Sequence, residues 1–501
     1  MLTTNHQLAS LVMPRLDANH WKSSVYRDDA FRLLDIGVGG FGIFIGGLEE
    51  TAAMLESLQQ RAGGSLLFGA DYEYGLPMRL TNGGIAMPRA MALGRGDVEQ
   101  TEQVAAAVAR EMRALGVHWN WAPVADVNSE PANPIINVRA FGEEAKHVAL
   151  HVAAWVRGTQ AEGIAACLKH APGHGATTTD SHQDLPTIAV SASRASNREF
   201  VPFREGVVSS VASVMVGHLL VPFLDSRKPA SLSSAVVNGL VRDTWGFNGV
   251  VVTDALDMGA ITKRYDAGDA TVRAITAGND IALMPSNAVE GIAALQKAFE
   301  KGTITPSRLD ASLERVKQLR AMKKTWPKST TVNQSAHAQL ALNAAHRAIH
   351  MEGDRSLLPI TKSNHAAVLG VVGEDDALVA TQWFQFLAQA TEMNIDFGYI
   401  NGDISQTELS QLEQSINDAD ILVFGMFSAA SAFRSKTPGI EQIPEIMLSL
   451  AKGRPVIVVV CGSPYGTDLF SANLTIHAYS DTTPSLAASV LTLTGKQQPT
   501  G

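Results

Sequence analysis

Cysteine is nearly absent from this sequence, and charged residues are scarce. The 501 residues include two cysteines, Cys167 and Cys461, which lie far apart within apolar segments. Their number and separation exclude a disulfide scaffold and a cysteine-ligated metal site. Charged residues make up 18% of the chain and hydrophobic residues 46%, which excludes general disorder and is typical of a large globular protein.

Basic residues and long apolar runs are also lacking. The chain has 40 Lys+Arg against 49 Asp+Glu, so its formal net charge of −9 provides no attraction to nucleic acid or to an anionic membrane surface. No stretch approaches the ~20 apolar residues that a membrane span requires. Residues 1–27 contain no apolar run of signal-peptide length. We therefore expect a cytoplasmic protein whose partners include neither nucleic acid nor membrane.

Short apolar runs alternate with amphipathic helical patterns from about residue 30 to residue 330. This alternation predicts βαβ units and a parallel sheet, and its length fits one α/β barrel better than a small open sheet. Catalytic residues of such a barrel lie at the C-terminal ends of the strands. The strand candidates are Gly42–Gly46, Ser65–Ala70, His118–Pro123, Ala165–His170, Ser213–Leu220, Gly249–Asp254 and Asp280–Met284.

A second alternation of strands and helices follows two helical segments. Its strand candidates are apolar and several are rich in β-branched residues, which suits a buried parallel sheet. We predict a catalytic barrel domain over residues 1–330, a helical linker over 331–354 and a second domain over 355–501. The strand candidates of the second domain are Ala366–Val372, Ile395–Ile400, Ile421–Met426 and Val456–Val460.

The densest polar segment runs from Lys169 to Asp184 and holds one lysine, three histidines and two aspartates. Pro172 and Gly173 disfavour a helix, so we interpret the segment as a loop that leaves a strand. A solvated loop without function is one alternative. Another is a metal site, although the helical spacing of its first two histidines is interrupted by Pro172-Gly173. The ligands of that alternative would be His170, His174, Asp180 and His182.

Asp254 closes a second apolar strand and is the other candidate for chemistry. A carboxylate at this place is either a helix cap or a group whose charge is controlled by burial and neighbours. Glycoside hydrolysis needs a carboxylate that attacks carbon and a proton donor that faces it. In Asp180-Ser-His182, the aspartate could orient the imidazole and stabilise its cation, as the acid of a catalytic triad does.

Weaker signals come from three other segments. Asp71-Tyr-Glu73 follows a strand, with Arg79 eight residues further on, and Arg139 ends a loop; each is equally compatible with a structural ion pair. The G-x-G-x-x-G pattern over residues 37–42 precedes a predicted strand instead of a helix. We therefore interpret it as a false match to a dinucleotide-binding loop.

The string Lys169-His170-Ala-Pro-Gly-His-Gly, followed by Asp180-Ser-His182 and by Asp254 in a Thr-Asp-Ala-Leu-Asp-Met context, resembles glycoside hydrolase family 3. More narrowly, it is similar to the bacterial β-N-acetylglucosaminidase branch. The resemblance implies a (β/α)8-type, TIM-like barrel followed by a smaller αβα sandwich domain. It also implies that Asp254 is the nucleophile and that His182, paired with Asp180, is the acid/base. It places five residues in the sugar-binding subsite: Asp71, Arg79, Arg139, Lys169 and His170.

The resemblance implies a retaining exo-β-N-acetylglucosaminidase that forms a covalent glycosyl-aspartate, without cofactor or metal. Peptidoglycan fragments or chitooligosaccharides are the expected substrates. Several alternatives stay open. They are a phosphorylase or a β-glucosidase on the same scaffold, a metal-dependent hydrolase, and a sugar-binding protein without activity.

Overall fold

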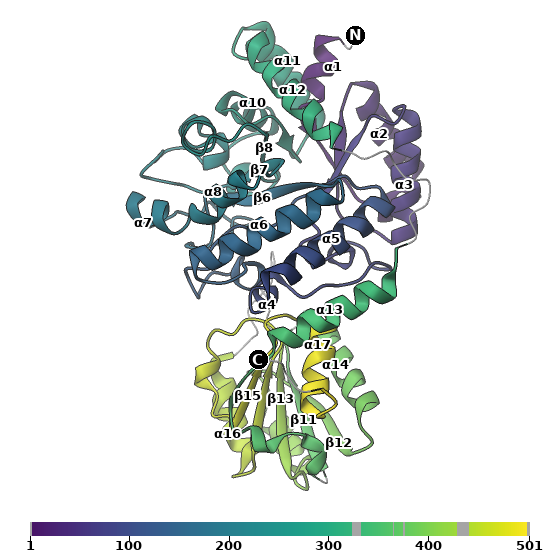
Figure 1. Ribbon diagram of the computed structural model, residues 1–501, viewed down its shortest axis with the longest axis vertical. Helices are drawn as coiled ribbons and strands as arrows, with labels where there is room; N and C mark the ends of the chain where they lie inside the picture. The colour runs from purple at the N-terminus through teal and green to yellow at the C-terminus, as the bar shows by residue number, and fades with distance from the viewer. Residues whose placement is uncertain (1–2, 323–331, 364, 374–375, 428–439, 498–501) are drawn as a thin grey trace. The chain divides into compact units, whose positions relative to one another are not determined.

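The computed structural model describes residues 3–322, 332–363, 365–373, 376–427 and 440–497 (Figure 1). Contacts divide the chain into two compact units. The first comprises Met1–Ile85, Val98–Ile136 and Ala140–His337; the second comprises Ala86–Asp97, Asn137–Arg139 and Ala338–Gly501. Two short segments from within the first 330 residues thus pack with the second unit. The domain ranges 1–330, 331–354 and 355–501 stay a prediction.

Parallel strands form a closed ring in the first unit. Strands β2 to β8 pair in sequence order, and β8 is bridged to β9 through Val252 and Ile281. Strand β9 pairs in parallel with β1, which continues into β2 across Pro14. The strands are β1 (Val12–Met13), β2 (Arg15–Leu16), β3 (Gly40–Ile43), β4 (Leu67–Ala70), β5 (Trp119–Asn120), β6 (Ala165–Ala171), β7 (Ser213–Val216), β8 (Val250–Thr253) and β9 (Ala282–Leu283).

Helices that follow the strands cover the outside of this ring (Figure 1). They are α2 (Ser24–Asp35), α3 (Leu48–Arg61), α5 (Val98–Leu115), α6 (Ala145–Ala161), α8 (Val201–Val208), the π-helix Ala235–Thr244, α10 (Ala267–Ala277) and α11 (Ala288–Glu300). Further helices are α1 (Thr4–Ala9), α7 (Ala192–Asn197), α9 (Gly259–Thr262) and α12 (Pro306–Ala321). The predicted (β/α)8-type barrel is confirmed.

Small residues allow α5 and α6 to lie side by side (Figure 1). A Cβ added at Gly158 of α6 would come within 2.2 Å of the carbonyl oxygen of Glu102 on α5. One side of α5 is buried and includes Val104, Val108 and Met112, whereas exposed charged side chains of this helix lie on its other side. The helices therefore pack through an apolar stripe, as the amphipathic pattern predicts.

The second unit is a six-stranded sheet with helices on both faces. Its strands are β10 (His350–Gly353), β11 (His365–Val371), β12 (Asn394–Ile400), β13 (Ile421–Met426), β14 (Val456–Val460) and β15 (Leu474–His477), in the order β10-β15-β14-β13-β11-β12. Strand β10 is antiparallel and the others are parallel. Its helices include α4 (Ala90–Leu93), α14 (Ala377–Ala390), α15 (Gln406–Ser415), α16 (Ile443–Ala451) and α17 (Thr483–Leu493), while α13 (Gln334–Ala348) leads into it.

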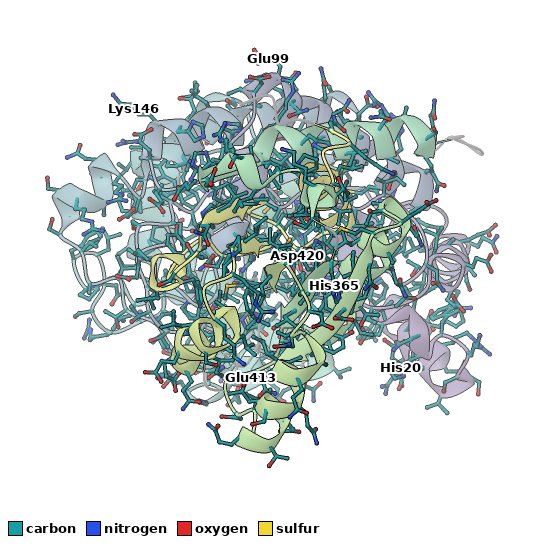
Figure 2. The ribbon with its side chains drawn as sticks, turned by 90° about the horizontal axis from the view of Figure 1, so that it is seen from below. His20, Glu99, Lys146, His365, Glu413 and Asp420 are labelled. Atoms are coloured by element: carbon teal, nitrogen blue, oxygen red, sulfur yellow. The ribbon has the colours of Figure 1, made fainter. Side chains whose placement is uncertain are left out.

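Alternating side chains supply two separate cores for this sheet. Along β11, Ala366 and Val368 belong to the cluster that contains α14 and α17, whereas Ala367 and Leu369 belong to the cluster that contains α16. The period of two places each set on one face, so the predicted αβα sandwich is confirmed. Where β11 and β13 begin, His365 and Asp420 lie beside each other (Figure 2). Asp420 N donates to the carbonyl oxygen of His365 at 2.9 Å.

Candidate active site

Polar residues lie at the ends of four barrel strands, all at the same edge. Asp71 follows β4, Lys169 and His170 lie at the end of β6, His218 follows β7 and Asp254 follows β8. Because all barrel strands are parallel, their C-terminal ends meet at one edge. The fold therefore collects residues that are up to 183 positions apart in the sequence.

Asp71 is held between two cations. Lys169 Nζ lies 2.7 Å from Asp71 Oδ1, and Arg79 Nη2 pairs with Asp71 Oδ2. The same Nζ lies 2.6 Å from Glu73 Oε1, and the Lys169 side chain is 2% exposed. Burial raises the pKa of the Asp71 carboxyl, but the charges of Lys169 and Arg79 outweigh burial and hold the pKa below its usual value. Asp71 therefore presents a carboxylate at this edge.

A buried carboxylate, Asp126, orients the histidine loop, the segment from Lys169 to Asp184. It is fully buried, and its Oδ2 lies 2.8 Å from His170 Nδ1. Its Oδ1 accepts a hydrogen bond from the backbone N of His174 at 2.6 Å. A carboxylate can only accept, so His170 Nδ1 carries a proton. Burial raises the pKa of Asp126, yet His170 and His174 together lower it below its usual value. Asp126 therefore fixes the ring of His170 and directs its Nε2 away from the carboxylate.

Asp180 and His182 form a close pair on the loop that leaves β6. His182 Nδ1 lies 2.8 Å from Asp180 Oδ1, and the backbone N of His182 donates to the same oxygen at 2.9 Å. Nδ1 must donate to the carboxylate, so Nε2 is the nitrogen that can take up and release a proton. The His182 side chain is 26% exposed, which gives it access to solvent.

This loop is attached to the segment that follows Asp254. The backbone N of Gly259 donates to the carbonyl oxygen of His182 at 3.1 Å, and the backbone N of Ala260 donates to that of Ser181 at 3.3 Å. A Cβ added at Gly259 would meet the carbonyl oxygen of His182 at 2.7 Å. The acid/base candidate and the nucleophile candidate are therefore held to each other through backbone hydrogen bonds.

His174 holds the loop from the other side, and the hydroxyls around it define its tautomer. Thr177 Oγ1 donates to the carbonyl oxygen of His174 at 2.9 Å. The Thr177 hydroxyl oxygen therefore accepts from His174 Nδ1, which lies 2.7 Å away. His174 Nε2 lies 3.0 Å from Ser181 Oγ. Ser181 stands between Asp180 and His182, so this contact with the His174 ring helps to fix the position of their loop.

Three imidazoles determine the charge of Asp254. Burial raises the pKa of its carboxyl, but His170, His218 and His182 outweigh burial and hold it below the usual value. Asp254 Oδ1 accepts from the backbone N of Ala255 at 2.8 Å. The turn is fixed by His218, whose Nε2 donates to the carbonyl oxygen of Ala255 at 2.8 Å and whose Nδ1 lies 2.7 Å from Ser231 Oγ. Burial lowers the pKa of His218 below its usual value.

The structure thus brings most of the predicted site residues to one edge of the barrel. These residues form a network with two parts. Ion pairs join Asp71, Arg79 and Lys169, and hydrogen bonds or electrostatic influence join His170, Asp180, His182 and Asp254. Arg139 differs, because the 3-10 helix Asn137–Arg139 belongs to the second unit. Its role in sugar binding stays a prediction.

Sequence reasoning missed three residues of this network. Asp126 lies in an irregular segment after β5, and His218 lies inside the predicted strand Ser213–Leu220. Glu73 was seen beside Asp71 but was given no partner. The rule that polar residues at barrel strand ends carry function could have identified His218. Nothing in the sequence connects Asp126 to His170, which lies 44 residues away.

The alternative metal site does not form. Within the described ranges, no group of three or more His, Cys, Asp or Glu side chains could hold a metal ion. His174 instead has both ring nitrogens bonded to hydroxyls.

Among the described helices, none combines the length and hydropathy needed to cross a bilayer.

The sequence of this chain is similar to those of known proteins. Residues 3–319 match the family model described as glycosyl hydrolase family 3 N terminal domain. A beta-hexosaminidase A from Pseudoalteromonas piscicida is 32% identical over 367 residues, which cover 66% of this chain and 60% of that protein. A beta-N-acetylglucosaminidase/beta-glucosidase from Cellulomonas fimi is 29% identical over 354 residues, covering 66% of this chain and 63% of the relative. The chain therefore spans about three fifths of the length of these relatives.

The fold of the whole chain is also found in a solved structure. A glycoside hydrolase family 3 beta-N-acetylglucosaminidase from Paenibacillus sp. str. FPU-7 superposes with a TM-score of 0.86 at 31% identity, covering 99% of this chain and 98% of that one. The similarity thus extends over the barrel and the sandwich unit.

Proposed function

Because this chain belongs to glycoside hydrolase family 3, we propose that it is a retaining exo-β-N-acetylglucosaminidase. The observation that carries the proposal is the pairing of two groups. A carboxylate at a strand end, Asp254, is kept ionised by imidazoles, and the Asp180–His182 pair is bonded to the segment just beyond it. Double displacement at an anomeric carbon requires a nucleophile and a proton donor of this kind.

In the proposed reaction Asp254 attacks the anomeric carbon while His182 protonates the departing glycosidic oxygen. The negative charge of Asp180 stabilises the imidazolium before transfer and holds the ring so that Nε2 faces the substrate. Neutral His182 then deprotonates a water molecule, which attacks the glycosyl-aspartate and releases the sugar with retained configuration.

The remaining polar residues of the barrel edge would bind the sugar. Asp71 presents acceptors and Lys169 presents donors, while Asp126 directs His170 Nε2 toward the site. These groups are positioned before substrate arrives, because each is fixed by an ion pair or hydrogen bond. Fixed dipoles and charges can bind the developing oxocarbenium ion more strongly than the ground state.

The substrate class is supported by the names of the relatives, which are beta-hexosaminidase and beta-N-acetylglucosaminidase/beta-glucosidase. We propose terminal N-acetylglucosamine on peptidoglycan fragments or chitooligosaccharides, handled in the cytoplasm. A β-glucoside is the first alternative, since the second of these names includes it.

One feature favours a second candidate, the phosphorylase. A carboxylate acid/base is anionic after it has given up its proton and would repel phosphate, whereas the imidazole of His182 is neutral at that stage. Phosphate could then replace water as the acceptor and yield a sugar 1-phosphate. Product analysis in phosphate buffer separates the two reactions; free sugar alone at high phosphate would reject phosphorolysis.

The test of the proposed function is hydrolysis of para-nitrophenyl β-N-acetylglucosaminide by the wild type and by Asp254→Ala, beside the matching β-glucoside. We expect preference for the acetamido sugar and loss of activity in the variant. Preference for the glucoside would change the substrate assignment. Cleavage of neither glycoside would contradict the proposal.

A further inference from the structure

Phe44 occupies a special position that the mechanism above does not use. It directly follows β3 at the same edge of the barrel, and its ring lies beneath two guanidinium groups. Arg79 Cζ is 3.9 Å from the ring centroid and Arg15 Cζ is 4.2 Å from it. Guanidinium groups at such distances are attracted to the negative face of an aromatic ring.

The guanidinium of Arg79 has few other partners. Its Nη2 pairs with Asp71, while its Nε is buried and has no hydrogen-bond partner among the described residues. Its position therefore depends on one ion pair and on the ring of Phe44. A planar cation that is held at one edge by a carboxylate can still pivot about that bond unless its face is also packed.

The backbone after β3 holds the Arg79 segment as well. The N of Gly46 donates to the carbonyl oxygen of Arg79 at 3.4 Å, and the N of Thr81 donates to that of Gly46 at 3.0 Å. The stretch from Phe44 to Gly46 thus contacts Arg79 through both its main chain and its side chain. The backbone hydrogen bonds fix the main chain of Arg79, and the contact with the Phe44 ring fixes its guanidinium.

Phe44 is itself fixed by its neighbours. Its backbone N donates to the carbonyl oxygen of Leu16 at 3.0 Å, and its side chain packs on the core of the barrel. The second cation over the ring, Arg15, is paired with Asp17 at 3.0 Å. Asp17 also accepts from the backbone N of Ile45 at 3.2 Å. The ring is therefore a rigid surface for Arg79.

We propose that Phe44 is a positioning residue for substrate binding: its ring holds the Arg79 guanidinium against Asp71, so that the Asp71 carboxylate meets the sugar hydroxyls in a single orientation. This inference rests on the proposed sugar-binding role of Asp71 and Arg79. It adds a residue that itself contacts no substrate and that determines affinity through its effect on Arg79.

The test is a double-mutant cycle between Phe44→Leu and Arg79→Ala, assayed with the aryl β-N-acetylglucosaminide. In the wild-type background, Phe44→Leu should raise KM roughly fivefold to tenfold with a smaller change in kcat, the fold-change expected for one partly desolvated cation–π contact. In the Arg79→Ala background, adding Phe44→Leu should change KM by less than about twofold, because the interaction is already lost. Phe44→Tyr, which keeps the ring, should restore the wild-type KM.

Phe31→Leu is the matched control. Phe31 on α2 also lies beneath an arginine, with Arg61 Cζ 5.8 Å from its centroid, but Arg61 pairs with Asp35 at the surface. We expect no change in KM for this variant. A similar rise in KM for both leucine variants would assign the effect to general packing and overturn the inference.

An equal rise in KM for Phe44→Leu in both backgrounds would also overturn the inference. A crystal structure of Phe44→Leu supplies a readout that does not depend on activity. Displacement of the Arg79 guanidinium from Asp71 supports the positioning role, and an unchanged ion pair contradicts it. If the wild type cleaves no glycoside, the proposed function fails and the crystal structure alone decides the role of Phe44. If Phe44→Leu does not fold, the structure of Phe44→Tyr decides instead, by whether Arg79 remains over the ring.

Discussion

The barrel and the sandwich unit both end their parallel strands in loops, but the residues at these ends differ in kind. In the barrel, β4, β6 and β8 end at or next to Asp71, Lys169 and Asp254. In the sandwich unit, the residues directly after β11, β13, β14 and β15 are Val372, Phe427, Cys461 and Ala478. Three strand ends of the barrel therefore carry ionisable side chains, whereas these four strand ends of the sandwich unit are apolar.

The difference shows that the barrel buries charged side chains at its strand ends, although such burial is unfavourable by itself. A buried charge is unfavourable unless partners compensate it. The barrel provides these partners in Lys169 for Asp71, and in several imidazoles for Asp254. Cys461 in the sandwich unit is simply buried, which raises its thiol pKa to about 12 and makes it inert. Chemistry depends on such sites and not on the architecture that both units share.

The largest expected effect is a difference in kcat between two variants, each of which changes one aspartate in one of the two units. Asp254→Asn should lower kcat on the order of 10⁴-fold or more, because the proposed nucleophile is lost. Asp376→Asn is the matched change: Asp376 is buried, comes directly before α14 and accepts from the backbone N of Gly373 at 3.2 Å. It should leave kcat unchanged. Steady-state kinetics measure both, and a comparable loss in Asp376→Asn would contradict the comparison.

The second prediction concerns buried charge in the sandwich unit. Arg89 pairs with Asp481, with side chains 12% and 9% exposed. Arg89→Ala should lower the free energy of unfolding by about 3 kcal/mol, since it removes the guanidinium that pairs with a largely buried carboxylate. Arg347→Ala removes an exposed pair with Asp97 in the same unit and should cost at most about 1 kcal/mol.

Denaturant unfolding followed by circular dichroism measures these costs. Neither change should alter kcat when the variants are assayed under folded conditions. A fall in kcat for the folded Arg89→Ala protein would mean that buried charge in the sandwich unit serves chemistry as well.

A third prediction tests the carboxylate beneath the histidine loop. Asp126→Asn should lower kcat/KM roughly 10–100-fold, the usual cost of losing a group that orients a functional histidine. Asp225→Asn is the control, because Asp225 likewise accepts from two backbone N–H groups and one hydroxyl. It should leave kinetics unchanged. Equal kinetic loss in the two variants would show that general destabilisation is responsible.

The smallest effect is expected at the hydroxyl that joins the loop to His174. Ser181→Ala removes one neutral hydrogen bond, worth about 1 kcal/mol, and should lower kcat about fivefold. Ser181→Thr keeps the hydroxyl and should retain most of the activity. Comparison of kcat for the two variants checks this. A loss in Ser181→Thr as large as in Ser181→Ala would show that loop packing, and not the hydrogen bond, is decisive.

Much of the barrel edge could be predicted from the sequence because its signals are local. Asp254 and Lys169 stand directly at the ends of apolar strands, and Asp180 and His182 are two positions apart. The residues that cannot be identified from the sequence depend on contacts between segments that are far apart along the chain. Asp126 contacts His170 only because the fold brings these segments together. The packing of Phe44 under Arg79 likewise has no signature in either segment.

Short strands were also difficult to identify from the sequence. The first barrel strand is interrupted by Pro14, and β15 contains only four residues. Each obtains its stability from pairing with strands that are far away in sequence, so propensity alone does not identify it. Arg139 illustrates a related limit, because the segment around it packs with the second unit although it lies between barrel elements.

The central claim is that Asp254 at the end of β8 forms the covalent glycosyl intermediate. The most direct measurement is trapping of the enzyme with a 5-fluoro N-acetylglucosaminyl fluoride, followed by mass spectrometry of the tryptic digest. The account predicts one added sugar on the peptide from Asp243 to Lys263, located on Asp254 and absent from Asp254→Asn. A sugar attached to any other residue, or turnover with inverted configuration and no adduct, would contradict it.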